Sequence, residues 1–402
     1  MRQVKVSDLK VGDIVACDVP NLHGQVLLAT GTVVGPKHGM ILKAWGIAEV
    51  VIVGESAVPG VPDPVPPTVA EIPARAPTGE ILHPAMAEIQ HIAAEARKDA
   101  PATPVASGAT PAKSSPAWQP VTPETIAGRA GNLASLPTIY FQVNSVINHP
   151  SSSTADIAKA LGSDQSLSAR LLRIANSAFY GFPRRIETIA EAVRIIGTKQ
   201  LHDLVLATVV MKQFKGLDPA LVNMADFWRH SLACGIAARC LAGLRRESNI
   251  ERYFLAGLLH DIGSLVIYQN LANRAQVVLE QHRATGKAVE VLERTILGCD
   301  HAAIGGALIQ EWKLPPVLKE VAANHHSLDP RLLSPAVAMV HVADVLTVSM
   351  GIGTNGELWP SSLSLPAWES LGLPPSSLSQ VATEMTGLLA EAQRLFLTED
   401  KA

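Results

Sequence analysis

The feature that most constrains the fold is a helical periodicity that begins near Leu133 and continues almost to the C-terminus. Ser153 and Thr188 each begin a sequence typical of a helix N-terminal capping box, and Gly197 is a usual residue just past a helix end. Many helices joined by short connections predict an all-helical bundle. The expected helices cover about 165–178, 188–196, 199–214, 225–243, 251–260, 262–271, 287–296, 301–312, 317–325, 335–350 and 378–397.

The rest of the chain divides by composition. Residues 1–56 contain short β-branched runs punctuated by glycines, which predict a small β-rich α+β module. Residues 57–127 are rich in proline and alanine and predict a flexible linker, because such a segment buries too little apolar surface to order itself. Within it, 84–98 has a helical pattern, which fits a packed helix as well as a transient one. A helical domain over 128–352 and a C-terminal loop and amphipathic helix over 353–402 complete the division.

Overall charge and composition exclude several classes of protein. The net charge of −3 gives no electrostatic support for a nucleic-acid partner. The first 18 residues interleave charges with apolar residues, so no secretory signal is expected, and no long uncharged apolar stretch predicts a membrane span. The four cysteines form no C-x-x-C pair and are interpreted as reduced core thiols of a cytoplasmic protein.

Imidazole and carboxylate side chains gather in the helical region. A divalent-metal site needs such ligands from several elements. Six of the thirteen histidines lie in or near apolar helices, where burial is costly without partners. A histidine alone in such a place is more often a core residue, but so many together favour a shared ligand. They are His230, His260, His301, His325, His326 and His341, with the carboxylates Asp226, Asp261 and Asp344.

The sequence contains two His-Asp dipeptides that could supply metal ligands. His260-Asp261 follows an apolar run and precedes Gly263, which predicts an interior helix end with room for an ion. His202-Asp203 follows a polar helix start, which predicts a capping or surface pair. His282 lies in a polar stretch and is expected to be solvated, and His341 is not expected to be a ligand.

Nine short motifs stand in one order along the helical region. They are Leu136-Pro137, Asp164-Gln165-Ser166-Leu167, Ile174-Ala175-Asn176-Ser177-Ala178, Ile195-Ile196-Gly197, Phe227-Trp228-Arg229-His230-Ser231, Gly257-Leu258-Leu259-His260-Asp261-Ile262-Gly263, Asp300-His301-Ala302-Ala303-Ile304-Gly305, Trp312-Lys313-Leu314-Pro315 and His325-His326. In this order they resemble the HDOD family, a bacterial branch of the HD superfamily, over about residues 130–350. The first 56 residues are similar to a module often placed before HD-GYP domains.

The resemblance implies a ligand set for one or more divalent ions such as Fe or Mn. In HD-superfamily metalloenzymes the ligands run His, His-Asp and a later Asp. HD-GYP relatives extend the site with an earlier acidic residue, a further His and a His-His pair. The first set corresponds here to His230, His260, Asp261 and Asp344, and the extension to Asp226, His301, His325 and His326, with Asp261 expected to bridge two ions.

The resemblance also frames the function. HDOD relatives are regulatory domains, so we expect a bacterial signalling protein that binds a protein partner or a small nucleotide ligand. The sequence is also compatible with a homodimer. The alternative is a metal-dependent phosphohydrolase acting on a nucleotide or phosphodiester. A third possible function is that of a scaffold protein, in which a bound metal only stabilises the fold. No Gly-Tyr-Pro follows His326, so cyclic-di-GMP phosphodiesterase activity is not expected.

Overall fold

The computed structural model describes most of the chain outside the predicted linker. Much of 57–127 therefore lies outside the described residues, and its predicted flexibility stays a prediction. The described residues are 2–10, 12–17, 19–20, 26–28, 31–34, 42, 47, 49–53, 83–96, 118–133, 136–182, 184–214, 217–219, 221–327 and 329–397.

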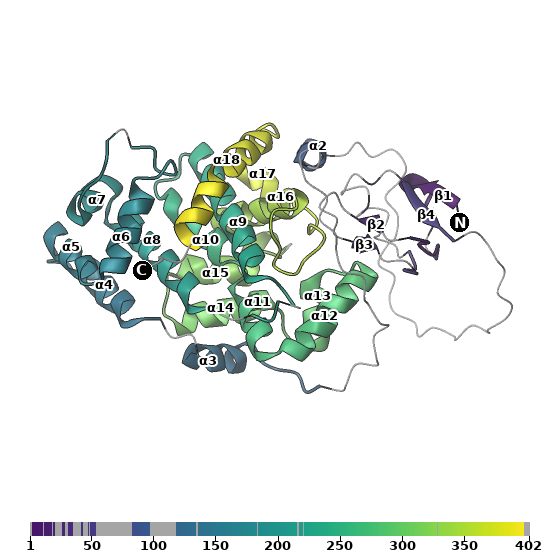
Figure 1. The fold of residues 1–402 in the computed structure, drawn as a ribbon, viewed down its shortest axis with the longest axis horizontal. Helices are drawn as coiled ribbons and strands as arrows, with labels where there is room; N and C mark the ends of the chain where they lie inside the picture. Colours follow the sequence, from purple (N-terminus) through teal and green to yellow (C-terminus); the bar gives the residue numbers. More distant parts are fainter. Residues whose placement is uncertain are drawn as a thin grey trace.

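Helices dominate the described residues, as the periodicity predicts, and they gather into one bundle (Figure 1). They are α2 (Pro84–Ala96), α3 (Pro123–Leu133), α4 (Thr138–Asn148), α5 (Thr154–Gly162), α6 (Gln165–Ala175), α7 (Ile189–Ile196), α8 (Thr198–Gln213), α9 (Met224–Leu244), α10 (Ile250–Leu259), α11 (Ile262–Asn270), α12 (Ala272–Thr285), α13 (Val289–Ile296), α14 (His301–Glu311), α15 (Pro316–Asn324), α16 (Pro335–Ser349), α17 (Leu365–Leu371) and α18 (Ser377–Leu397), with the short 3₁₀ helices η1 (Val6–Asp8) and η2 (Pro330–Leu332).

Local capping fixes several of these helix boundaries. The Ser153 hydroxyl accepts from the Asp156 amide, and the Asp156 carboxylate accepts from the Ser153 amide, so the predicted capping box of α5 is confirmed. Thr188 caps α7 through the Glu191 amide. Gly197 ends α7 with φ of 95°, a left-handed conformation that glycine adopts at no steric cost.

The centre of the bundle is α9, which packs against α10, α16 and α18. Both α9 and α16 are buried along most of their length, so burial of apolar surface on several sides holds them in place. Because α9, α10 and α16 carry the predicted ligands His230, His260 and Asp344, the same packing brings those side chains together.

The N-terminal module pairs its strands in two antiparallel ribbons, as the glycine-punctuated pattern predicts. These are β1 (Arg2–Lys5) with β4 (Glu49–Ile52), and β2 (Val19–Pro20) with β3 (Val26–Leu28). Its small core gathers Val15, Leu28 and Ile52. Two residues from the far end of the chain, Leu358 and Trp359, complete that core, so the module is packed against the loop between α16 and α17.

The two helices in or near the predicted linker both pack on the bundle. In α2, Ile89 and Ile92 are buried, and this helix contacts α16 and α18. In this structure the part of 84–98 that is described, α2, is a packed helix. Helix α3 begins at Pro123 and buries Ile126 against its neighbours, so it spans the predicted boundary at residue 127.

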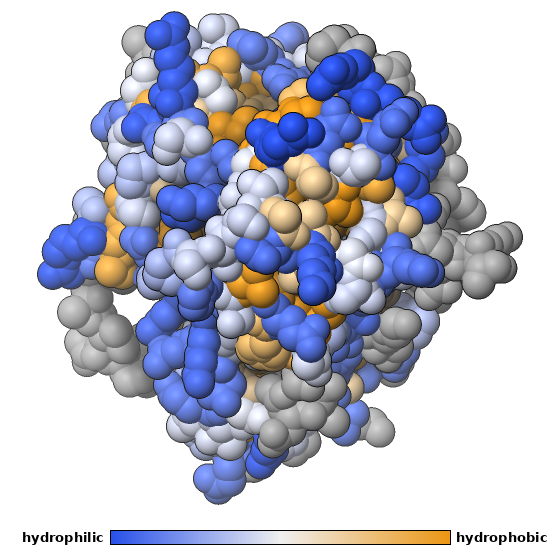
Figure 2. Space-filling model, turned by 90° about the vertical axis from the view of Figure 1, so that its left-hand side faces the viewer, coloured by the Kyte–Doolittle hydropathy of each residue, from blue (hydrophilic) through white to orange (hydrophobic). Residues whose placement is uncertain are grey.

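The surface and the cysteines complete the description. The face toward the viewer in Figure 2, on the side of α4 to α7 in Figure 1, shows apolar patches among hydrophilic side chains. Phe141 on α4 and Ile195 on α7 are exposed apolar side chains. No helix in the described part of the chain has both the length and the apolar character to cross a membrane. The cysteines are free thiols, but Cys17 is exposed, whereas all four were expected in the core.

Candidate metal centre

The backbone places the predicted ligands at the ends and inner faces of adjoining helices. His260 and Asp261 form the junction between α10 and α11, and His301 is the first residue of α14. Gly263 makes this junction possible, because a Cβ there would lie 2.0 Å from the His301 carbonyl oxygen. A glycine at 263 therefore lets α11 approach α14 closely enough to bring His301 to Asp261.

One group of ligand atoms converges on a point between α9, α10 and α16. His230 Nε2 lies 3.4 Å from Asp261 Oδ2 and 3.3 Å from Asp344 Oδ1. His260 Nε2 lies 3.0 Å and 3.6 Å from the same two oxygens. All four side chains are almost fully buried. The ligand atoms of His230, His260 and Asp261 lie within 4.8 Å of one another, and Asp344 Oδ1 adjoins both imidazoles, so together they offer two nitrogen and two oxygen donors to one ion.

A second group converges on the other oxygen of Asp261. His301 Nε2 and His325 Nε2 lie 3.5 Å and 3.4 Å from Asp261 Oδ1. His326 joins them, with its Nε2 2.9 Å from His301 Nε2. The ligand atoms of all four residues lie within 4.8 Å of one another. The two oxygens of Asp261 therefore face two separate groups, which is the arrangement of a carboxylate that bridges two ions.

Hydrogen bonds at Nδ1 orient three of the imidazoles. The Nδ1 of His260 donates to the Gly257 carbonyl at 2.7 Å, and that of His301 to the Glu293 carboxylate at 2.6 Å. His325 donates to the backbone of α15, with the Ala322 carbonyl at 2.9 Å. When the ring is neutral, a proton on Nδ1 leaves the Nε2 lone pair turned toward the centre, which is how metal-binding histidines are held.

Several inward-facing atoms of the centre have no hydrogen-bond partner. A buried polar atom without a partner costs about 1–3 kcal/mol, so a cluster of them calls for an explanation. A divalent cation would satisfy them together, and the nitrogen and oxygen donors suit a first-row metal. The unpartnered atoms are Nε2 of His230, His260 and His325, Oδ1 of Asp261 and Oδ1 of Asp344.

The carboxylates and imidazoles shift one another's protonation. Burial alone would lower the pKa of His260, but the Asp261 carboxylate outweighs it and raises that pKa well above the ordinary value. Burial would raise the pKa of Asp261, but His260 and the neighbouring imidazoles lower it well below the usual range. His260 thus retains a proton that a metal must displace, whereas Asp261 is already ionised, so metal affinity rises with pH.

Two other polar residues considered from the sequence belong to neither group of ligand atoms. Asp226 is half-buried, and it belongs to none of the ligand groups found among the described residues. His341 is buried, but its nitrogens bond to the His325 carbonyl and the Ser364 amide, which fits its expected non-ligand role.

Two expectations about exposure were wrong. His202 and Asp203 are 8% and 5% exposed, because α8 packs against α4 and α10 and carries the pair inside, where Asp203 accepts from Asn249. His282 is 1% exposed. It is buried because it joins two backbone segments, donating to the Lys287 carbonyl and accepting from the Leu358 amide.

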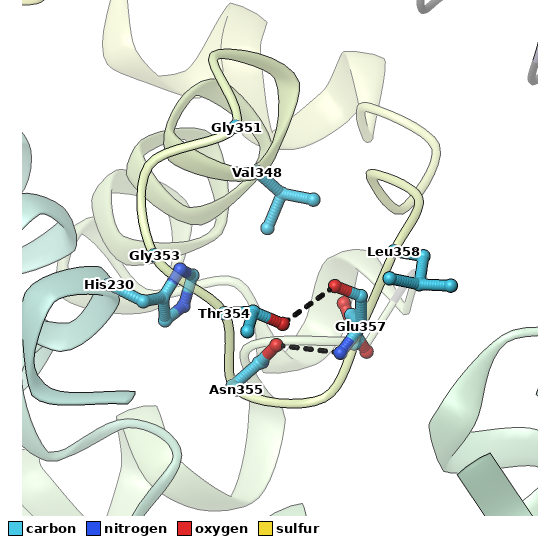
Figure 3. A pocket seen from close by; sticks show the side chains of 8 residues that line it. All are labelled: His230, Val348, Gly351, Gly353, Thr354, Asn355, Glu357 and Leu358. Atoms are coloured by element: carbon cyan, nitrogen blue, oxygen red, sulfur yellow. Dashed lines mark hydrogen bonds between the residues drawn. The ribbon is translucent and has the colours of Figure 1, made fainter. Parts of the chain in front are cut away.

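A loop between α16 and α17 covers the centre, and we call residues 351–359 the capping loop. The Asn355 amide donates to Asp261 Oδ2 at 2.6 Å, and the Tyr268 hydroxyl donates to the Asn355 carbonyl. Figure 3 shows Asn355, Thr354 and Glu357 of this loop around a small cavity that His230 also lines. Its volume of about 10 Å³ suits a water-sized group.

Sequence reasoning missed four residues of the centre. Glu293 orients His301, Asn355 contacts Asp261, and Glu290 and Glu357 approach His326. For Asn355 and Glu357 the sequence offers one signal, the run Gly-Thr-Asn-Gly-Glu at 353–357. This run predicts a turn, but it does not indicate which residues the turn contacts.

Comparisons with known proteins agree with the helical fold. Residues 133–328 match the family model of the HDOD domain. A solved HDOD domain protein of unknown function from Geobacter sulfurreducens is 26% identical, with a TM-score of 0.57 over 68% of this chain and 98% of that one. A solved protein from Marinobacter aquaeolei VT8 is 17% identical, with a TM-score of 0.53 over 78% of this chain and 66% of that one, and shows the fold alone.

One curated relative adds a sequence match. An uncharacterised protein of Treponema pallidum (strain Nichols) is 26% identical over 242 residues, or 60% of this chain. The chain spans only 47% of that protein's length.

The helical fold and the family match together identify this part of the chain as similar to HDOD domains. The chain carries an HDOD domain at residues 133–328. Asp344, the capping loop and the N-terminal module all lie outside the matched range.

Proposed function

We propose that this chain is a regulatory protein whose HDOD domain binds a pair of divalent ions and transmits their presence to the N-terminal module. One observation carries the proposal: the capping loop contacts both parts. Asn355 bonds to Asp261 in the metal centre, and three residues later Leu358 enters the core of the module. A change at either end of so short a segment displaces the other.

The metal part of the proposal rests on donor chemistry. Asp261 stands between two groups of imidazole nitrogens, and Asp344 closes the first group. Histidine with carboxylate suits Fe, Mn or Zn better than Mg or Ca. Two ions sharing Asp261 would neutralise the buried carboxylates and fix the helices that supply the ligands.

The proposed coupling between the metal centre and the N-terminal module is supported by packing at the C-terminal end of the capping loop. Trp359 is 5% exposed and lies in one core with Val15 and Ile52 of the module. Its ring also contacts His282 of α12, with 5.7 Å between the ring centroids. The loop is therefore clamped between the module and the helical domain. By linkage, whatever binds at one end changes the affinity at the other by the same factor.

This coupling would also allow a signalling partner to control metal binding. A protein or small nucleotide that prefers one position of the module would alter metal binding, and metal would alter the affinity for that partner. A second copy of the chain could act in the same way.

A second candidate function is metal-dependent phosphoester hydrolysis. The bridging position of Asp261 favours it, because two ions about 4 Å apart can activate a water and clamp a phosphoryl group. Against it, the ligands are buried and the cavity beneath the capping loop is only about 10 Å³. Hydrolysis of a generic phosphodiester with Mn²⁺, lost in Asp261→Ala, would establish the enzyme and displace the regulatory proposal.

Hydrogen exchange of the full chain tests the coupling. We expect Mn²⁺ to slow exchange of the amides of β4 in the wild type. In Trp359→Ala, Mn²⁺ should still bind, but this protection of β4 should disappear. Trp118→Ala is the matched control, since Trp118 stacks under Arg274 and is not part of the core that Trp359 shares with the module. Equal protection of β4 in wild type and Trp359→Ala would refute the coupling.

A further inference from the structure

A third group of ligand atoms lies beside the proposed metal pair. It consists of Glu290 on α13, His326 after α15 and Glu357 in the capping loop. One ligand atom from each lies within 4.8 Å of the others, and His326 Nε2 is 4.0 Å from Glu357 Oε1. Three separate segments thus bring two carboxylates and an imidazole to one point.

The burial of Glu357 supports a bound ligand at this point independently of the grouping. It is 6% exposed, and neither of its carboxylate oxygens has a hydrogen-bond partner. A buried carboxylate without any partner is among the most costly groups that a protein can hold. A proton on Glu357 would not remove the problem, because the new O–H group would also need an acceptor. Glu290 Oε2 and His326 Nδ1 are buried and unpartnered as well.

His326 can serve only one ion through Nε2, because an imidazole nitrogen has a single lone pair. Asp261, His301 and His325 still supply three ligands to the second ion of the pair without it. Three protein ligands are enough for a bound divalent metal that keeps an open position. His326 is therefore available to the carboxylates of Glu290 and Glu357.

We propose that Glu290, His326 and Glu357 bind a further divalent cation of the Mn²⁺ or Zn²⁺ type, separate from the pair held around Asp261. This proposal rests on the proposed metal centre, since His326 adjoins it. Two carboxylates with one imidazole are the mixed donor set that such ions accept. The ion fastens the capping loop to α13 and α15 next to Leu358, so it locks the segment that joins the centre to the N-terminal module.

Stoichiometry of Mn²⁺ binding to the full chain tests the proposal. Metal-free protein is saturated with Mn²⁺, freed of excess and analysed for metal and protein, with circular dichroism as the check on folding. We expect Glu357→Gln and Glu290→Gln each to hold one Mn²⁺ per chain fewer than wild type. Glu369→Gln, at an exposed position on α17, is the matched control and should keep the wild-type content.

The outcomes separate this proposal from the metal pair. Wild-type Mn²⁺ content in both Glu357→Gln and Glu290→Gln overturns the further site and leaves the pair standing. Loss of all Mn²⁺ from folded Glu357→Gln also overturns it, because Glu357 would then belong to the pair. A wild type that binds no Mn²⁺ or Zn²⁺ refutes the proposed function itself.

Discussion

His282 gives the capping loop a dependence on pH that can be worked out from the structure. Burial lowers the pKa of His282 from 6.5 to about 4, with a smaller contribution from Arg283 in the same direction, while the Lys287 carbonyl opposes it. The neutral ring accepts from the Leu358 amide. In the unfolded chain the ring takes up a proton below pH 6.5, whereas in the folded chain it stays neutral down to about pH 4. The unfolded state thus binds more protons in this window.

Proton linkage gives the direction and the size of the change in unfolding free energy with pH. The stabilisation by neutral His282 is fully present above pH 6.5 and is lost as the pH falls from 6.5 toward 4. The whole shift corresponds to about 3 kcal/mol, of which about 2 kcal/mol is lost between pH 7.5 and pH 5. Protonation also removes the acceptor of the Leu358 amide, so the capping loop should loosen in the same range.

The variant His282→Gln isolates this contribution, because a carboxamide can accept from Leu358 but does not titrate. Urea unfolding of metal-free protein, followed by circular dichroism at pH 7.5 and pH 5, gives the free energy at each pH. We expect the wild type to lose about 2 kcal/mol more than His282→Gln over this interval. His149→Gln, at an exposed histidine, should behave as wild type. An equal loss in wild type and His282→Gln would refute the assignment of a neutral, buried His282.

Three further substitutions probe the packing. Trp359→Ala should lower the unfolding free energy of the N-terminal module by about 3–5 kcal/mol, as for other buried tryptophans, measured by urea unfolding. Asp203→Ala should cost about 1–3 kcal/mol in the same assay because it removes the buried acceptor of the half-buried Asn249 amide. A cost below about 0.5 kcal/mol, as for an ordinary surface substitution, would contradict this role of Asp203. Gly353→Ala should release the capping loop to protease, because φ is +65° and the new Cβ would lie 2.3 Å from the Asp226 carbonyl oxygen; unchanged cleavage would contradict this.

The fold was largely predictable because its signals are local. Periodicity and capping residues such as Ser153 depend only on neighbours in the sequence, so they fix helix positions before any packing occurs. The final helix, expected over 378–397, is observed over Ser377–Leu397. Helix α3 was not expected from the sequence, and its contacts come from α14 and α11, far along the chain.

The centre was only partly predictable. The ligand types and the helix junction at His260 could be read from the sequence, but their convergence depends on helix packing. His202 shows the limit, because a polar helix start predicted exposure and tertiary contacts buried it. Glu357 and Asn355 lie in a loop without periodicity, so nothing in their neighbourhood indicates that they meet Asp261 and His326.

The central claim is that Asp261 joins two divalent ions, and electron paramagnetic resonance of Mn²⁺-loaded full-length protein tests it most directly. Two Mn²⁺ ions that share a carboxylate about 4 Å apart give a broadened, exchange-coupled spectrum instead of the sextet of an isolated ion. We predict the coupled component in the wild type and its loss in Asp261→Asn, with Asp203→Asn retaining it. A wild type that shows only the uncoupled sextet at saturation would contradict the account.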